Sequence, residues 1–143
     1  MASEKVVLDA SVLAKWYLDE EYSDRALEIR DAYISGKIRI AAPALLIYEV
    51  LNAMRYSGVY SEDELTEIAE SINKYGFEIH GFTEPLKEQT VKIALKHDVS
   101  IYDATYISLA KTLNTKLYTA DDKLISKVAQ PNLVKHISTF PSR

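Results

Sequence analysis

The sequence contains no cysteine, only three histidines and only four glycines among its 143 residues. Without cysteine the chain has no disulfide and no thiolate zinc site, and three scattered histidines offer little for an imidazole-rich metal site. None of the glycines forms part of a phosphate-cradling loop, which disfavours a nucleotide-binding enzyme. If a metal binds, we expect one that accepts oxygen ligands.

Long apolar runs are also absent. The longest, residues 41–48, is far shorter than the about 20 residues of a membrane span. Glu4 and Lys5 do not resemble the front of a signal peptide. We therefore expect a cytoplasmic protein that makes no use of a membrane.

A strong positive charge is missing as well. The formal net charge is -4 and the sequence pI is near 5.4, which argues against a protein that grips nucleic acid by its overall field. A nuclease whose bound cations meet the phosphates remains compatible with this charge.

The chain alternates strand-like and helix-like segments without a linker, and its length fits a single domain over residues 1–143. We expect strands at residues 6–8, 38–41, 77–80, 116–119 and 133–137. We expect helices at residues 11–17, 23–34 and 44–56, from 61 through at least 72, from the turn at 81–85 to about 97, at 101–113 and at 121–129. Strands separated by such helices predict a parallel sheet with helices on both faces.

Asp9 follows the apolar run Val6-Val7-Leu8, which is typical of a buried strand. In open α/β sheets the working crevice lies outside the carboxyl ends of the strands, so an acid at this place is a candidate site residue. Considered alone, Asp9 is as well explained as a cap or turn residue.

Glu49 is the only charge in residues 41–51. A helix that is apolar nearly all round is expected to be buried, and a buried carboxylate needs a cation, a metal or a proton. The plain alternative is an ion pair with Arg55, which lies six residues along and on a different helical face.

Asp103 is the only charge in residues 101–110, although Ser100-x-x-Asp103 also has capping-box spacing. Asp121 follows the strand expected at 116–119. We expect Thr119-x-x-Asp122 to cap the next helix, which leaves Asp121 without a local task and favours it as a site residue.

These motifs occur in the order of a known family. They are Leu8-Asp9-Ala10-Ser11, Tyr48-Glu49, Ser100-Ile101-Tyr102-Asp103 and Tyr118-Thr119-Ala120-Asp121. In this order, over about residues 6–137, the chain resembles a PIN domain, most of all the ribonuclease toxins of VapBC-type toxin-antitoxin pairs. Each motif alone would be weak; the specificity lies in the four together.

The resemblance implies an α/β fold, a PIN-like three-layer sandwich with a central, mostly parallel sheet of about 4–5 strands and helices on both faces. It implies an acidic quartet that binds Mg²⁺ or Mn²⁺ and cleaves RNA, with two supporting polar residues: Asp9, Glu49, Asp103 and Asp121, with Ser11 and Thr119. Asp122 could share or replace the role of Asp121. The resemblance further implies an RNA substrate, a small cognate antitoxin and a homodimer.

The expected chemistry has a physical basis. Two carboxylates about 4 Å apart repel by roughly 4 kcal/mol at an effective dielectric of ~20, so four of them need protons or hard cations. Such cations can lower the pKa of a bound water and balance charge at a phosphodiester. We assign Asp9 and Asp103 as principal ligands, Asp121 as a further ligand, and Glu49 as a ligand or a water-orienting base.

The same pattern of acids also suggests other functions. A phosphoacceptor receiver domain would usually pair two acids after its first strand and place a lysine after a late one, and neither arrangement is clear here. A PIN nuclease of RNA processing without an antitoxin remains an alternative. A non-catalytic PIN-like binding module is less favoured, because all four expected acids are present.

Overall fold

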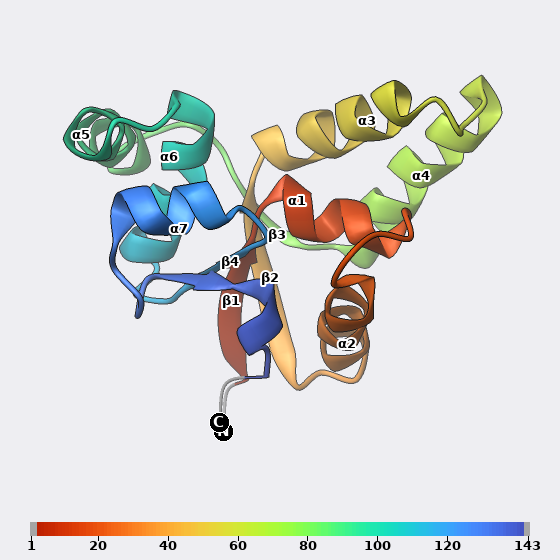
Figure 1. The fold of residues 1–143 in the computed structure, drawn as a ribbon, viewed down its shortest axis with the longest axis horizontal. Coiled ribbons are helices and arrows are strands. Elements are labelled where there is room, and N and C mark those ends of the chain that lie inside the picture. The colour runs from red at the N-terminus through yellow and green to blue at the C-terminus, as the bar shows by residue number, and fades with distance from the viewer. Residues whose placement is uncertain (1–2, 142–143) are drawn as a thin grey trace.

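The computed structural model describes residues 3–141 and is built around a five-stranded sheet in which every pairing is parallel (Figure 1). The strands are β1 (Glu4–Leu8), β2 (Ile38–Pro43), β3 (Glu78–His80), β4 (Leu117–Thr119) and β5 (Val134–His136). Their order in the sheet is β3-β2-β1-β4-β5. The predicted parallel α/β fold is confirmed, and each expected strand is found within about two residues of its predicted ends.

The remaining elements are seven α-helices and two short 3-10 helices within the described residues. The α-helices are α1 (Ala10–Leu13), α2 (Ser23–Ile34), α3 (Leu45–Ser57), α4 (Glu62–Tyr75), α5 (Leu86–His97), α6 (Ile101–Thr112) and α7 (Asp122–Val128); the 3-10 helices are η1 (Ala14–Trp16) and η2 (Ile137–Thr139). Among residues 3–141, no helix has the length and apolar character needed to cross a bilayer.

The helices form two layers, one on each face of the sheet. The chain moves from β1 through β2 to β3 at one edge, then returns past β1 to β4 and β5. Right-handed crossovers therefore place α1 to α4 on one face and α5 to α7 on the other, as Figure 1 shows. The direction of winding reverses between β1 and β4, and in open α/β sheets such a switch point is where ligands bind.

The central strand β1 lies between β2 and β4 and is covered on both faces. Val7 pairs with Ala41 on one side and with Leu117 on the other, and Val7 and Leu8 are fully buried. This burial explains why the strand reads as a continuous apolar run rather than as an alternating pattern. It also fixes the position of Asp9, the next residue along the chain.

The α3–α4 hairpin is defined by local signals. Gly58 ends α3 in the left-handed conformation with φ 74°, which glycine adopts without a steric penalty. Ser61 and Glu64 then form a reciprocal capping box: the Glu64 amide donates to Ser61 Oγ at 3.2 Å, and the Ser61 amide donates to Glu64 Oε1 at 2.9 Å.

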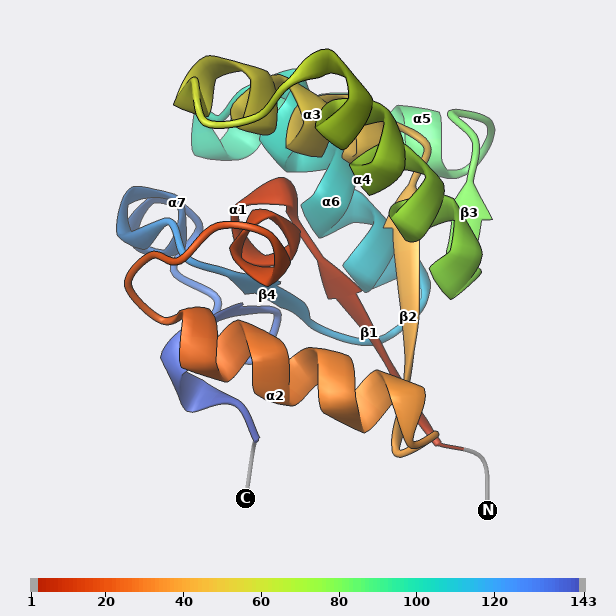
Figure 2. The ribbon, with the colours of Figure 1, turned by 90° about the vertical axis from the view of Figure 1, so that its right-hand side faces the viewer.

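The expectation that α3 is buried nearly all round is wrong. Leu46, Val50 and Met54 face the core, but Tyr48 and Tyr56 are 72% and 73% exposed. The helix carries apolar residues on a face that no other layer of the described chain covers, as its position at the outer rim in Figure 2 illustrates. A sequence pattern alone cannot distinguish core from uncovered surface in such a helix.

Candidate functional site

Asp9 stands at the carboxyl end of β1 and begins α1 as its N-cap. Its Oδ1 accepts hydrogen bonds from the amides of Ser11 and Val12 at 3.1 and 3.3 Å. The residue is only 7% exposed, and burial raises the pKa of its carboxyl to about 6. The negative charge of Asp103 adds to this rise, whereas the hydrogen bonds oppose it. The capping role of Asp9 is therefore present, and it does not exclude the site role predicted for the same side chain.

Two hydroxyl groups connect the first turn of α1 to the end of β4 beside this acid. Ser11 Oγ donates to Asp9 Oδ1 at 2.5 Å and accepts from the Ala120 amide at 3.0 Å. Thr119 is fully buried at the end of β4, and its hydroxyl lies 3.4 Å from that of Ser11. A hydrogen bond from Thr119 also lowers the pKa of Asp9. The two residues expected as polar support thus hold Asp9 in place.

Asp121 lies two residues beyond Thr119, the last residue of β4, and caps α7. Its Oδ1 accepts a hydrogen bond from the Leu124 amide at 3.1 Å. The prediction that Thr119 caps this helix and leaves Asp121 without a local task is wrong. Thr119 Oγ1 instead accepts from the Asp121 amide at 3.1 Å, because the hydroxyl is held at the buried end of the strand. Asp122 points elsewhere: its side chain is 91% exposed and lies 3.6 Å from His136.

Asp103 lies in the first turn of α6, and its amide donates to Ser100 Oγ at 3.0 Å. The capping role expected for this segment is therefore present. The half-buried carboxyl of Asp103 has a raised pKa, first because of burial and second because of the charge of Asp121. A hydrogen bond with Ser100 and the charge of Lys127 act in the opposite direction. Asp103 thus interacts electrostatically with both Asp9 and Asp121.

Glu49 reaches the same region from α3. Its Oε1 accepts a hydrogen bond from the hydroxyl of Tyr106 on α6 at 2.7 Å. The alternative partner, Arg55, lies instead over the ring of Tyr56, with its guanidinium carbon 4.7 Å from the ring centre. Among residues 3–141, the carboxyl of Glu49 is therefore held by the phenol of Tyr106 rather than by a cation.

Tyr106 is the residue that sequence reasoning missed. It is 1% exposed, and burial, the hydrogen bond to Glu49, and the charges of Glu49, Asp9 and Asp103 all raise its pKa. It therefore stays protonated and donates. Its position three residues after Asp103 places both on one helical face, which is the signal that could have found it.

A cavity of about 620 Å³ opens beside these acids. It lies between α1 and η1, the last turns of α3, and the segment joining β4 to α7. Its lining includes Ser11, Lys15, Tyr56 and the exposed Asp121, which is the one predicted acid among its lining residues in the described part of the chain. Asp122 is not among its lining residues.

The PIN domain family matches residues 6–131 of this sequence. The chain belongs to the PIN domain family. The family prediction made from the four acidic motifs is confirmed.

The relatives of this PIN domain include a curated ribonuclease. Over 128 residues the chain is 34% identical to Ribonuclease VapC3 of Pyrobaculum aerophilum, covering 86% of this chain and 94% of that protein. The crystal structure of PAE2754 from Pyrobaculum aerophilum matches with a TM-score of 0.65 and 26% identity, covering 97% of this chain and 93% of that one. A toxin-antitoxin complex from Klebsiella pneumoniae matches with a TM-score of 0.69 and 15% identity, covering 91% and 96%.

The acids of this PIN domain suit a hard divalent cation in their chemistry. All the donors are carboxylates, and the pKa values of Asp9 and Asp103 are raised partly by like charges. Within residues 3–141, no group of three or more His, Cys, Asp or Glu side chains is arranged to hold an ion jointly. Mg²⁺ typically keeps several waters and uses one or two carboxylates, so pairs such as Asp9 with Asp103 fit its requirements.

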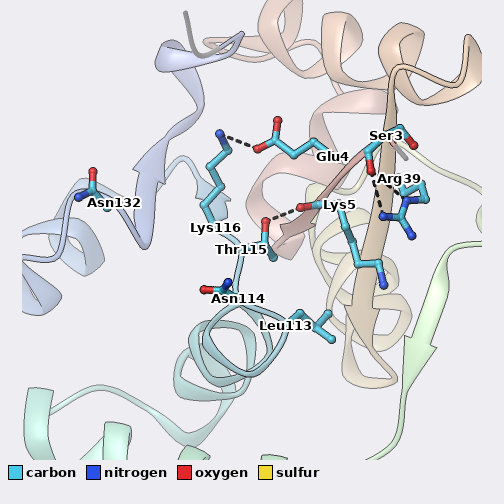
Figure 3. Close-up of a pocket in the computed structure, with 9 residues that line it drawn as sticks. All are labelled: Ser3, Glu4, Lys5, Arg39, Leu113, Asn114, Thr115, Lys116 and Asn132. Atoms are coloured by element: carbon cyan, nitrogen blue, oxygen red, sulfur yellow. Dashed lines mark hydrogen bonds and ion pairs between the residues drawn. The ribbon is translucent and has the colours of Figure 1, made fainter. Parts of the chain in front are cut away.

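A second hollow of about 510 Å³ lies at the opposite, amino-terminal end of β1 (Figure 3). Its cations are already engaged: Lys116 pairs with Glu4 at 2.8 Å, and Arg39 donates to the Ser3 carbonyl at 2.9 Å. Lys5 pairs with Glu78 at 2.8 Å. This hollow contains none of the predicted acids, so the candidate site stays at the carboxyl ends of the strands.

Proposed function

We propose that this PIN domain is a metal-dependent endoribonuclease that hydrolyses phosphodiester bonds in RNA and acts in the cytoplasm as the toxin of a type II toxin-antitoxin pair. The observation that carries the proposal is the electrostatic interaction of Asp9 with Asp103 and of Asp103 with Asp121 at the switch point of the sheet. Its similarity to Ribonuclease VapC3 supports the ribonuclease activity.

The residue roles in this proposal follow from their positions. Asp9 and Asp103 would be the principal ligands of Mg²⁺ or Mn²⁺, and Asp121 would act on the ion as a further ligand through one of its bound waters. Glu49 would serve as a ligand or orient the attacking water. When bound, such a cation lowers the pKa of a bound water and balances charge at the cleaved phosphate.

The remaining side chains act as positioning residues. Ser11 and Thr119 orient the carboxyl of Asp9 through their hydroxyls. Tyr106 stays protonated and holds Oε1 of Glu49 toward α6. In this arrangement one oxygen of Glu49 is engaged by the phenol, and the other is free of that bond and can accept from water.

The partners of the proposed enzyme are RNA, an antitoxin and a second copy of the chain. The fold match to a toxin-antitoxin complex from Klebsiella pneumoniae supports the first protein partner. For the second copy, the support is a mainly apolar hollow of about 210 Å³ near Pro43, lined by the exposed Phe82, Ile101 and Tyr102 and, at one point, by His80. Charged residues are depleted at the cores of homodimer interfaces, which favours this face.

The deciding experiment measures loss of a labelled RNA by the purified protein with Mg²⁺ or Mn²⁺ and with EDTA. We expect metal-dependent degradation by the wild type and none by Asp9→Asn, with a circular dichroism spectrum unchanged. Glu62→Gln, at an exposed position on α4, is the control and should retain full activity. Degradation that persists in EDTA or in Asp9→Asn would refute the proposal.

A small reading frame for a DNA-binding antitoxin beside the gene would favour the toxin over a PIN nuclease of RNA processing. Co-expression provides the biochemical test, since a cognate antitoxin should copurify with the chain and suppress its ribonuclease activity.

A further inference from the structure

The cavity of about 620 Å³ is lined by two residues, Lys15 and Tyr56, that have no part in the proposed acidic site. Its volume lies within the range of about 300–1,000 Å³ that is usual for small-molecule sites. Asp121 also lines it, so a ligand in the cavity would lie next to the proposed site of hydrolysis. Lys15 and Tyr56 belong to different elements, η1 and α3, and both line the same space.

Lys15 is a largely desolvated cation in an otherwise acidic region. Its side chain is 10% exposed, and its ion pair within residues 3–141 is with Glu20, at 3.5 Å between Nζ and Oε1. Glu20 is 48% exposed and also lines the cavity, so this pair is long and open to water on one side. An ammonium group held in this way can exchange a solvated carboxylate for a phosphate oxygen at little cost.

Tyr56 provides the second feature. Its ring is 73% exposed, although it lies beside a cavity and next to the Arg55 guanidinium. Exposed aromatic rings beside cationic groups are the elements with which proteins bind unpaired nucleobases, since every base has a face that stacks. A largely buried ammonium group and an exposed aromatic side chain that line the same cavity provide contacts for the phosphate and the base of one nucleotide.

We propose that this cavity is a subsite for a nucleotide of single-stranded RNA next to the cleaved bond, with Lys15 binding its phosphate and Tyr56 stacking on its base. The inference rests on the proposed ribonuclease function and adds a substrate preference to it. An unpaired strand is required, because a base within a duplex cannot present its face to Tyr56. A paired RNA of the same sequence should therefore bind more weakly.

The test measures binding of a short fluorescein-labelled single-stranded RNA by fluorescence anisotropy, in the Asp103→Asn background so that the RNA stays intact. We expect Tyr56→Leu to weaken binding about tenfold. Tyr48→Leu is the matched control, because Tyr48 is equally exposed on the same helix but lies outside this cavity. Its affinity should match that of the parent protein.

The role of Lys15 is tested by removing its positive charge. We expect Lys15→Met to weaken binding and to reduce the slope of log affinity against log salt by about 0.7, the contribution of one phosphate on a single strand. Lys15→Arg should retain most of the affinity. Glu20→Gln should tighten binding two- to threefold, because it removes the carboxylate that competes for Lys15. This variant keeps Lys15 itself and so tests the same contact if Lys15→Met folds poorly.

In the cleavage-competent protein, Tyr56→Leu and Lys15→Met should raise KM more than they lower kcat, which a loss of folding would not do. Wild-type protein that neither binds nor cleaves RNA would refute the ribonuclease proposal itself. Wild-type protein that cleaves RNA, while Tyr56→Leu and Glu20→Gln behave like Tyr48→Leu, would overturn the subsite and leave the ribonuclease proposal standing.

Discussion

The hydroxyl of Tyr106 donates a hydrogen bond to Oε1 of Glu49 at 2.7 Å and so joins α6 to α3. The two residues are 57 positions apart in the sequence. Because the charges of Asp9 and Asp103 also act on the pKa of Tyr106, this phenol lies close to three of the four predicted acids. Tyr106 is not one of the four predicted acids, yet its hydrogen bond determines where the carboxyl of Glu49 points.

Replacing Tyr106 by phenylalanine should separate orientation from folding. We expect Tyr106→Phe to reduce kcat for RNA cleavage about ten- to a hundredfold, because Glu49 loses its fixed direction. The cost in unfolding free energy should be about 1–2 kcal/mol, measured by urea denaturation. Tyr33→Phe is the control: it removes the hydrogen bond from Tyr33 to the Tyr75 carbonyl, at 2.6 Å, and should leave kcat unchanged. Equal loss of activity in both variants would contradict an orienting role.

Asp9 should destabilise the metal-free protein at neutral pH. Burial raises its pKa from the usual 3.8 to about 6, so between these values the folded state holds a proton that the unfolded state has lost. The stabilisation from protonated Asp9 is therefore complete below about pH 4 and is lost as the pH rises through about 6. One pKa unit is worth about 1.4 kcal/mol, which gives a change of about 3 kcal/mol.

The measurement is urea denaturation in EDTA across this pH range for the wild type and for Asp9→Asn, which keeps the helix cap. The stability advantage of the variant should grow with pH and level off above about 6. An advantage that is independent of pH would contradict the assignment to Asp9.

Divalent metal should stabilise the wild type. At a free concentration 100 times Kd, binding to the folded state alone adds about 2.7 kcal/mol, which corresponds to several degrees in Tm. We expect Mn²⁺ or Mg²⁺ to raise Tm in a thermal melt and EDTA to reverse the effect. The double variant Asp9→Asn with Asp103→Asn should show no response. A wild-type melting curve that is indifferent to millimolar Mn²⁺ would count against the metal site.

Asp121 and Asp122 are adjacent, and separate substitutions test which of the two carboxylates acts in RNA cleavage. Asp121 lines the cavity and acts on Asp103, whereas the side chain of Asp122 is 91% exposed near His136. We expect Asp121→Asn to reduce RNA cleavage at least a hundredfold and Asp122→Asn to change it less than twofold. Both variants should melt near the wild type, since asparagine caps a helix about as well as aspartate. The reverse order of activities would transfer the role to Asp122.

The mainly apolar hollow near Pro43 should determine the association state of the protein. Placing a charge at its rim with Phe82→Asp should shift a wild-type dimer to monomer in light scattering after gel filtration. Leu95→Asp is the control, because Leu95 is 80% exposed on α5 and does not line this hollow. A monomeric wild type, or dimers in both variants, would rule out this face as the interface.

Local signals predicted much of the fold. The buried run before Asp9 and the capping box at Ser61 depend on neighbouring residues, so the sequence indicated strand and helix ends to within a few positions. The parallel sheet followed from the alternation of elements. The cap of α7 was predicted at the wrong residue, because Thr119 is engaged by the buried end of β4, a contact that the local spacing does not reveal.

By itself, the sequence determined the order of the elements, the family and the positions of four isolated acids, because periodicity, caps and motif order are properties of the chain. Only the tertiary structure decided that Tyr106 holds Glu49, that Asp121 rather than Asp122 borders the cavity, and that Lys15 and Tyr56 share it. The physical reason is that burial, electrostatic interaction and cavity shape depend on distances between residues that are remote along the chain, which the fold alone brings together.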